Sequence, residues 1–142
     1  MSKVTVAKDQ AEELYTIVRR SPVAQVPGAM ETMRKCVRRS AKIYYGEVNG
    51  QVACVWGLIP PTILSDSAYL WLLTTDIVAE NKFLFVRHSQ RYVEEMLKEF
   101  PLIIGDCMLD NPQAVRWLRW LGAHFHDPVD GRLPFSIRAT NG

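Results

Sequence analysis

Two histidines, His124 and His126, stand two residues apart and are followed directly by Asp127. In an extended segment, side chains at positions i and i+2 point to the same face, so both imidazoles would lie together. Two histidines and one carboxylate are groups that a zinc ion accepts as ligands. The sequence offers no further ligand at a useful spacing. We therefore interpret these residues as polar side chains at a strand edge and expect no metal.

The three cysteines are the other residues that could bind a metal or form a disulfide. Cys36, Cys54 and Cys107 are odd in number and far apart, and they lack the short paired spacings of a zinc site. We expect reduced, mostly buried thiols, as in a cytosolic protein.

Positive charge gathers in the first 42 residues of a chain whose net charge is only +2. On two neighbouring helices these side chains could form a patch for an acidic partner or for nucleic acid. Interspersed acidic residues dilute the charge, so a solvated face is the simpler interpretation and nucleic acid is not expected. If the patch binds a macromolecular partner, the candidate residues are Arg19, Arg20, Arg34, Arg38 and Arg39.

Length and composition indicate one globular domain covering residues 1–142. A content of 48% hydrophobic residues supports a real core and argues against disorder. The first residues lack the apolar stretch of a signal peptide, and no segment reaches the roughly 18 apolar residues of a membrane span. We expect a soluble, intracellular protein.

The first half of the chain has the pattern of a strand, two helices and a meander. Val4 and Val6 alternate with polar residues, and Asp9 is placed to cap a helix that ends near residues 21–22. A second helix ends at about Ser40. Asn49 and Gly50 tolerate positive φ angles and predict a two-residue hairpin turn, after which a third strand spans 67–76.

The second half alternates helices and strands. Apolar residues fall at helical spacing from Phe83 to Phe100, and Pro101 ends that helix. The apolar run 102–109 predicts a buried crossover strand beside the strand at 69–75, and 134–139 is a last, weak strand. The order predicts an α/β fold of the mixed-sheet (α+β) type, with six or seven strands and helices on both faces.

A helix is predicted between Asn111, which can cap its start, and Gly122, which can end it. Its apolar residues recur at i, i+3, i+4 and i+7, so Trp117 is expected in the core and Trp120 half-buried beside it. Pairs of tryptophans can stack on nucleic-acid bases, but such platforms usually lie on a sheet or loop within a charged groove.

This segment also carries a resemblance to a known family. Its pattern resembles the Asn-x-x-Ala-(apolar) helix ending in Leu-Gly that closes the GNAT N-acetyltransferase domain, and the order of elements is similar over nearly the whole chain. The resemblance implies a single-domain, GNAT-like acyl-CoA N-acyltransferase fold. The residues that match are Asn111, Ala114, Val115, Trp117, Leu121 and Gly122.

A second resemblance is to the small GNAT-like internal virion proteins of short-tailed (podovirus-type) phages. It rests on residues that recur there in similar form: Trp71, Thr74, Asp76, Asn111, Arg116 and the GAHFH run ending at His126. This resemblance implies a protein of the host cytoplasm, possible packaging in the virion, and a phage structural protein or host protein as partner.

The GNAT resemblance implies that acetyl-CoA would be held by a glycine-containing loop before a helix, because glycine lets backbone amides approach the pyrophosphate. The corresponding segment, 74–87, has no glycine, and none occurs between Leu58 and Ile104. Candidate cofactor contacts are therefore reduced to Lys82 and Arg87, which could meet phosphates as point charges, together with Asn111.

The same resemblance implies a proton donor seven residues after Asn111, where the family often has a tyrosine. That position is Leu118, which has no proton to give. Tyr92 or Tyr69 could replace the donor, although each fits a core position more simply. Glu47, Asp76 and Asp106 are candidate general bases, although each fits better as a surface or capping carboxylate.

Two functions follow from these observations. The main hypothesis is a virion- or assembly-associated interaction module that uses a GNAT-like fold without standard acetyltransferase activity and without a cofactor. The alternative is an acetyl-CoA-dependent N-acetyltransferase that modifies an amine of a host protein or small molecule. The sequence leaves the acceptor and the oligomeric state open.

Overall fold

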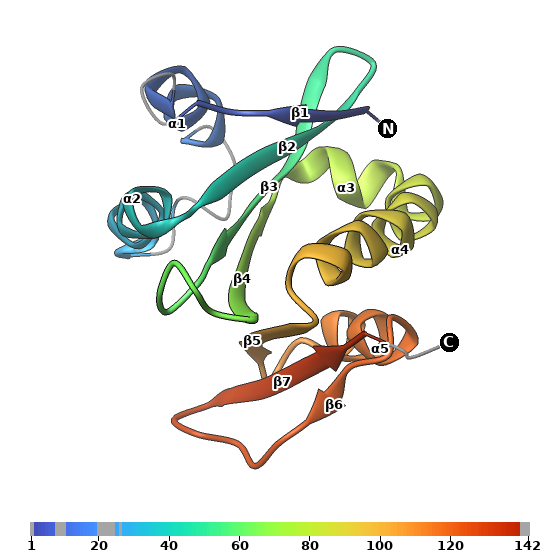
Figure 1. Cartoon of the computed structure of the whole chain (residues 1–142). Coiled ribbons are helices and arrows are strands. Elements are labelled where there is room, and N and C mark those ends of the chain that lie inside the picture. Colours follow the sequence, from blue (N-terminus) through green and yellow to red (C-terminus); the bar gives the residue numbers. More distant parts are fainter. Residues whose placement is uncertain (1, 8–10, 20–24, 26, 140–142) are drawn as a thin grey trace. The chain divides into compact units, whose positions relative to one another are not determined.

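The computed structural model describes residues 2–7, 11–19, 25 and 27–139. Seven strands form one hydrogen-bonded sheet in the order β1-β2-β3-β4-β5-β7-β6 (Figure 1). The chain divides into two compact units, one comprising Met1–Ile59 and Trp71–Phe85, and the other Pro60–Leu70 and Val86–Gly142. The mixed α/β architecture and the number of strands confirm the fold class expected from the sequence.

The described residues of the first unit form three strands and three helices. The end of β4 and the start of α4 also belong to this unit. In Figure 1, α1 and α2 lie on one side of β2 and β3, and α3 lies on the other. The elements are β1 (Ser2–Thr5), α1 (Ala11–Val18), α2 (Ala29–Arg39), β2 (Lys42–Val48), β3 (Gln51–Ile59) and α3 (Asp76–Glu80). Asp9, the expected cap of α1, lies outside the described residues.

Strand β3 is buried over six consecutive residues, from Ala53 to Leu58. A strand buried in this way has both faces covered, which agrees with helices on two sides. The hairpin that joins β2 to β3 turns at Asn49 and Gly50, whose φ angles are 51° and 78°. These are the positive values that a two-residue hairpin requires, so the predicted turn is confirmed.

A buried polar contact fixes the centre of this unit. The indole Nε1 of Trp71 donates to the Ser40 hydroxyl over 2.7 Å, and the Ser40 hydroxyl donates to the Cys36 carbonyl over 2.6 Å. Gly57 makes room for the indole, because a Cβ at this position would lie 2.4 Å from Trp71 Nε1. Glycine is therefore required here by close packing.

The second unit contains β5 (Leu102–Met108), α5 (Pro112–Trp120), β6 (His124–Phe125) and β7 (Arg132–Arg138), and it shares β4 (Ser67–Thr74) and α4 (Lys82–Glu99) with the first unit. β5 pairs in parallel with the start of β4, at Ser67–Tyr69, which confirms the predicted crossover strand. On its other side, β5 pairs antiparallel with β7 over all seven of its residues.

The structure corrects two expectations about these elements. A short helix, α3, precedes α4, whereas the sequence predicts one helix from Phe83; Thr75 caps α3 and Asn81 ends it. The last strand is not weak, because β7 lies between two partners, β5 and β6. Within the described residues, no helix is both long and apolar enough to span a membrane.

Helix α5 begins and ends as predicted, but its buried residue differs. The Asn111 side chain accepts from the Ala114 amide over 3.2 Å, and Gly122 has a φ of 96°. Trp117 is only half-buried, and its indole donates to the Ser89 hydroxyl of α4 over 2.9 Å. Leu118 takes the core position instead and is 4% exposed; Trp120 is 52% exposed.

Candidate functional site: a polar cluster on one face of β4, β5 and β7

The sheet of the second unit has two unlike faces. Gly105 of β5 pairs with Phe135 of β7, and Phe125 of β6 pairs with the same residue. Arg119 of α5 lies 5.7 Å from the centre of the Phe125 ring, so α5 covers this apolar face. Side chains alternate along a strand. Asp106, the next residue of β5, therefore points to the opposite face.

Three side chains from three adjacent strands meet on that opposite face. The Tyr69 hydroxyl of β4 donates to Asp106 Oδ2 over 3.0 Å. Arg132 of β7 donates its Nε proton to Asp106 Oδ1 over 2.6 Å, and its Nη2 contacts the same oxygen. Asp106 is thus the centre of a polar cluster, which we call the Tyr69–Asp106–Arg132 cluster.

The cluster is partly open to solvent, with 23% of the Asp106 side chain and 54% of the Arg132 side chain exposed. The hydrogen bond to Asp106 raises the pKa of the Arg132 guanidinium, which stays charged. Burial, and then the charge of Asp106, raise the pKa of the neighbouring Cys107 thiol. The ion pair is neutral overall and holds the cluster together.

This geometry limits the acid–base chemistry of Asp106. Both carboxylate oxygens already accept hydrogen bonds, one from Arg132 and one from Tyr69. A general base needs an oxygen aimed at the proton that it removes. Asp106 is thus held by Arg132 and Tyr69, and its role as a general base remains a prediction.

The other candidate acid–base residues stand on β2, α3 and α4. Glu47 is half-buried on β2, and Asp76 is exposed in the first turn of α3; both belong to the first unit. Tyr92 is 8% exposed on α4, where its ring stacks on His88 at a centroid distance of 6.2 Å. Tyr92 is therefore a core residue, as its spacing suggested.

The side chain of Thr75 makes the polar contacts at the junction between β4 and α3. Thr75 is the N-cap of α3, and its hydroxyl accepts from the Ile77 amide over 3.3 Å. The same hydroxyl lies 2.7 Å from the Val52 carbonyl oxygen and 3.0 Å from the Ala53 carbonyl oxygen. The Thr75 amide donates to the Ala53 carbonyl over 2.8 Å, and the Val78 amide donates to the Thr75 carbonyl.

These contacts test whether this junction fits the pyrophosphate of acetyl-CoA. A phosphate site at a helix start needs backbone amides that point at the ligand. Here the amides of Thr75, Ile77 and Val78 donate within the protein, and Asp76 adds a negative charge in the first turn. The residues present at this junction do not fit a pyrophosphate.

Two of the three candidate cofactor contacts lie on α4, and the third caps α5. Lys82 is exposed at the first residue of α4, and Arg87 is exposed five residues later. Residues five apart point in different directions around a helix. The Asn111 side chain is used to cap α5. Their roles toward a cofactor remain predictions.

The histidine pair lies at the β6 edge. The rings of His124 and His126 meet edge to face at a centroid distance of 5.3 Å, and His126 Nε2 is 3.1 Å from the Ser136 hydroxyl. Within the described residues, no group of three or more His, Cys, Asp or Glu side chains could hold a metal ion.

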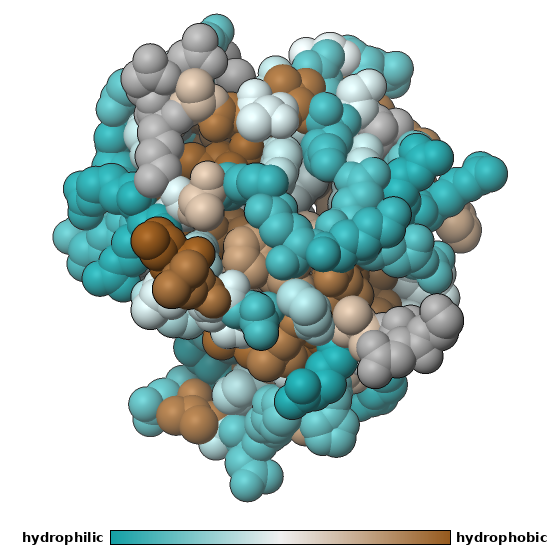
Figure 2. Space-filling view, viewed as in Figure 1, coloured by the Kyte–Doolittle hydropathy of each residue, from teal (hydrophilic) through white to brown (hydrophobic). Residues whose placement is uncertain are grey.

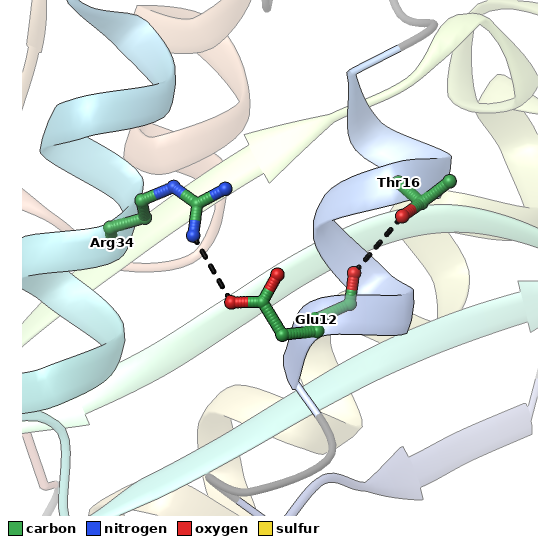
Figure 3. Close-up of polar contacts among 3 residues, drawn as sticks. All are labelled: Glu12, Thr16 and Arg34. Carbon is green, nitrogen blue, oxygen red and sulfur yellow. Dashed lines mark hydrogen bonds and ion pairs between the residues drawn. The ribbon is translucent and has the colours of Figure 1, made fainter.

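The basic residues of the first two helices are partly used within the fold. Arg34 of α2 donates to Glu12 of α1 over 3.2 Å, as Figure 3 shows, and its guanidinium lies 4.3 Å from the centre of the Tyr15 ring. Arg34 thus joins α1 to α2. Arg19, Arg38 and Arg39 are exposed, and Arg20 lies outside the described residues.

Comparison with solved structures places this architecture among known folds. The chain superposes on the ribosomal-protein-S18-alanine N-acetyltransferase of Escherichia coli with a TM-score of 0.70 and 14% identity, covering 99% of this chain and 96% of that one. The chain has the GNAT acetyltransferase fold. Neither protein-family models nor curated proteins yield a match to the sequence.

Other GNAT-fold structures give similar values. An acetyltransferase of Bacillus subtilis in complex with CoA matches with a TM-score of 0.70 and 9% identity, over 97% of this chain and 98% of that one. A variant of the spermidine N-acetyltransferase of Vibrio cholerae matches with a TM-score of 0.66 and 12% identity, over 97% and 95% of the two chains. At such identities the likeness concerns the fold alone.

Two residues of the site were not singled out from the sequence. Arg132 reaches Asp106 only because β7 pairs with β5, and no local pattern predicts that pairing. Thr75 did carry a local signal, since a threonine before an acidic first turn is typical of a helix N-cap. That signal was hidden because α3 is only five residues long.

Proposed function

We propose that this GNAT-fold chain acts as an interaction module for a macromolecular partner and does not carry out standard acetyl transfer. The observation that carries the proposal is the N-cap of α3. Thr75 and the backbone carbonyls around it use the amides that would otherwise face a pyrophosphate. A chain that cannot hold the cofactor tightly has no supply of acetyl groups.

The position of the missing proton donor supports the same conclusion. Leu118, which stands where the family often has a tyrosine, is 4% exposed and belongs to the core. It offers no proton to a departing thiolate. Because one fold serves many functions, the GNAT architecture is compatible with a non-catalytic role. The resemblance to internal virion proteins suggests a phage structural protein, or a host protein, as the partner.

The comparisons favour a second candidate, an acetyl-CoA-dependent N-acetyltransferase acting on an amine. The matched structures carry names of N-acetyltransferases and cover nearly the whole chain. Acetyl-CoA supplies an activated acetyl group. In this candidate the chain's own contribution would be to position the acceptor, and the Tyr69–Asp106–Arg132 cluster offers a fixed polar surface of the second unit for that purpose.

Binding of acetyl-CoA to the purified chain separates the two candidates. Isothermal titration calorimetry and thermal unfolding with millimolar acetyl-CoA should show no binding and a nearly unchanged melting temperature, since stabilisation depends on the ratio of ligand concentration to Kd. The Escherichia coli enzyme named above is the matched positive control. Micromolar affinity would contradict the cofactor-free proposal, and acetylation of an amine panel would establish the acetyltransferase.

A further inference from the structure

Two tight turns of this chain share one backbone geometry and one type of sequence. The φ angles are 51° and 78° at Asn49 and Gly50, and 50° and 76° at Asp130 and Gly131. Among the described residues, Asn49 and Asp130 are the two that are not glycine and still have a positive φ. Positive φ at both central residues is typical of the type I′ turn, which favours Asn-Gly and Asp-Gly. The first of these turns joins β2 to β3, and the second precedes β7.

The Asn49–Gly50 turn is open to water. Both residues are exposed, and a Cβ built on Gly50 would have no heavy atom within 4 Å other than those of its chain neighbours. Figure 2 shows hydrophilic and intermediate residues at the surface where Figure 1 draws the tip of this hairpin. The side-chain amide of Asn49 and the backbone nitrogen that follows it therefore lack bulky neighbours. Under these conditions an Asn-Gly pair can react with itself.

The reaction is deamidation through a cyclic imide. The Gly50 backbone nitrogen gives up its proton to water or hydroxide and attacks Cγ of Asn49, so that an N–Cγ bond forms. Glycine favours this attack, because it has no Cβ to crowd the nitrogen. The Cγ–Nδ2 bond then breaks, and the amide nitrogen takes up a proton and leaves as ammonia. Water opens the imide at either carbonyl, which gives aspartate or isoaspartate; the net change consumes water, releases ammonia and needs no oxidant or reductant.

The closed turn holds the reacting atoms apart. In a type I′ turn the ψ angle at the first central residue is about 30°, which turns the Cβ of Asn49 away from the Gly50 nitrogen. Ring closure requires rotation about this bond, and the rotation breaks the pairing of Val48 with Gln51. The register of β2 shifts just before this pair, so the last pair of the hairpin is set apart from the regular ladder. We therefore expect the tip to open locally without unfolding of the unit.

We propose that Asn49 is a site of spontaneous deamidation in the folded protein, and that transient opening of the β2–β3 turn controls its rate. This proposal goes beyond the interaction function and does not depend on it. The aspartate product fits the closed turn, because Asp130 adopts almost the same φ in the second turn. Isoaspartate does not fit, because it adds a methylene group to the main chain of a two-residue turn. Either product also adds a negative charge to a chain whose formal net charge is +2.

Peptide mapping of the folded chain tests the site directly. At pH 8, the tryptic peptide 43–82 should gain the mass that accompanies conversion of an amide to an acid, and fragment spectra should place the change at Asn49 and not at Asn81. An isoaspartate-specific methyltransferase should label the same peptide. The conversion should accelerate as pH rises, because the attacking nitrogen must lose its proton.

Two comparisons test control by the turn. Deamidation of Asn49 should be at least about tenfold slower in the folded chain than in urea, since the closed turn must first open. Val48→Ala shortens a side chain that is 7% exposed beside the turn, and it should accelerate the reaction in the folded chain. In urea the same variant should react within about twofold of the parent, because no turn remains to be opened.

The second turn and two variants serve as controls. Asp130 can form the same imide, but an ionised carboxylate is a poor electrophile, so isoaspartate should accumulate more slowly there than at Asn49. Asn49→Gly keeps a residue that accepts a positive φ and should abolish the mass change at this position. Asn49→Asp should melt close to the temperature of the parent, whereas the isolated isoaspartate form should melt lower.

Three outcomes would overturn the proposal. If Asn49 stays intact in the folded chain after it has converted fully in urea, the turn does not open far enough for the reaction. Equal rates in the folded chain and in urea would show that the turn does not hold Asn49. An unchanged rate for folded Val48→Ala would show that pairing at the tip does not control the reaction. Each outcome can be obtained whether or not the chain binds acetyl-CoA or a macromolecular partner.

Discussion

Tyr69 and Asp106 are joined by a hydrogen bond of 3.0 Å between two neighbouring parallel strands, although 37 positions separate them in the sequence. Backbone pairing brings Tyr69 opposite Ile104, and Asp106 follows two residues later on the same face. Arg132 completes the contact from the antiparallel strand on the other side. The cluster thus links three strands through one carboxylate.

We expect this hydrogen bond to stabilise the fold measurably. Tyr69→Phe should lower the free energy of unfolding by about 1–2 kcal/mol, because it removes the hydroxyl that donates to a charged, partly buried carboxylate. Asp106→Asn should also destabilise the protein, and the double variant should lose less than the sum of the two. Urea unfolding followed by circular dichroism measures all three.

Tyr44→Phe is the control for that cycle. Its ring packs against Trp56 at a centroid distance of 5.7 Å, a contact that the substitution retains. The change should cost less than about 0.5 kcal/mol. Strictly additive losses for Tyr69 and Asp106 would show that the two side chains do not interact in solution.

The burial of α5 leads to a ranking of three substitutions. Leu118→Ala should cost about 2–5 kcal/mol, since it opens a cavity in the core. Trp117→Ala should cost less than the about 3–5 kcal/mol typical of a fully buried tryptophan, because the indole is only half-buried. Trp120→Ala should cost about 1 kcal/mol or less. Thermal or urea unfolding measures the loss of stability in each variant. A larger loss for Trp120→Ala than for Leu118→Ala would show that the other face of α5 packs against the core.

The three cysteines should differ in reactivity. Burial raises the pKa of Cys54 to about 12, so its reactive thiolate form is scarce at pH 8. Burial also raises the pKa of Cys36 and Cys107, but both are only partly buried. With a chromogenic disulfide reagent, Cys36 and Cys107 should react in the native protein, faster as pH rises toward their pKa, and Cys54 only after unfolding. Single-cysteine variants assign each rate; rapid native reaction of Cys54 would contradict its placement.

Charge reversal on α2 should depend on the arginine that is changed. Arg34→Glu removes the contacts with Glu12 and Tyr15 and places two carboxylates together, so we expect a loss of about 1 kcal/mol. Arg39→Glu alters an exposed residue and should change stability by less than about 0.5 kcal/mol. High salt should reduce the Arg34 effect, because the pair is solvent-exposed. Equal effects of the two substitutions on stability would show that Arg34 does not join α1 to α2 in solution.

Local rules predicted the parts of this fold that depend on a few adjacent residues. The Asn49–Gly50 turn and the Asn111 cap required only backbone angles and one side-chain oxygen, and both are confirmed. The choice between Trp117 and Leu118 as the core residue could not be made in this way. Both belong to the same apolar stripe, and the rotation of α5 against its neighbours decides between them.

The candidate site depended on contacts that no local pattern contains. Asp106 was identified as a candidate because it is a carboxylate among sheet residues, but its partners Tyr69 and Arg132 come from strands whose pairing is set by the whole sheet. Thr75 shows the opposite case. The absence of glycine from the segment 74–87 could be seen in the sequence. That the Ile77 amide donates to the Thr75 hydroxyl could be seen only in the structure.

The two compact units have a consequence for the order in which the chain can fold during synthesis. Each unit is built from two separate stretches, and β4 contributes residues to both. A ribosome releases residues 60–70 before the stretch from Val86 onward that completes their unit. Neither unit can therefore be obtained by cutting the chain once. The residues of β4 that belong to the second unit cannot complete their contacts until the last third of the protein has been synthesised.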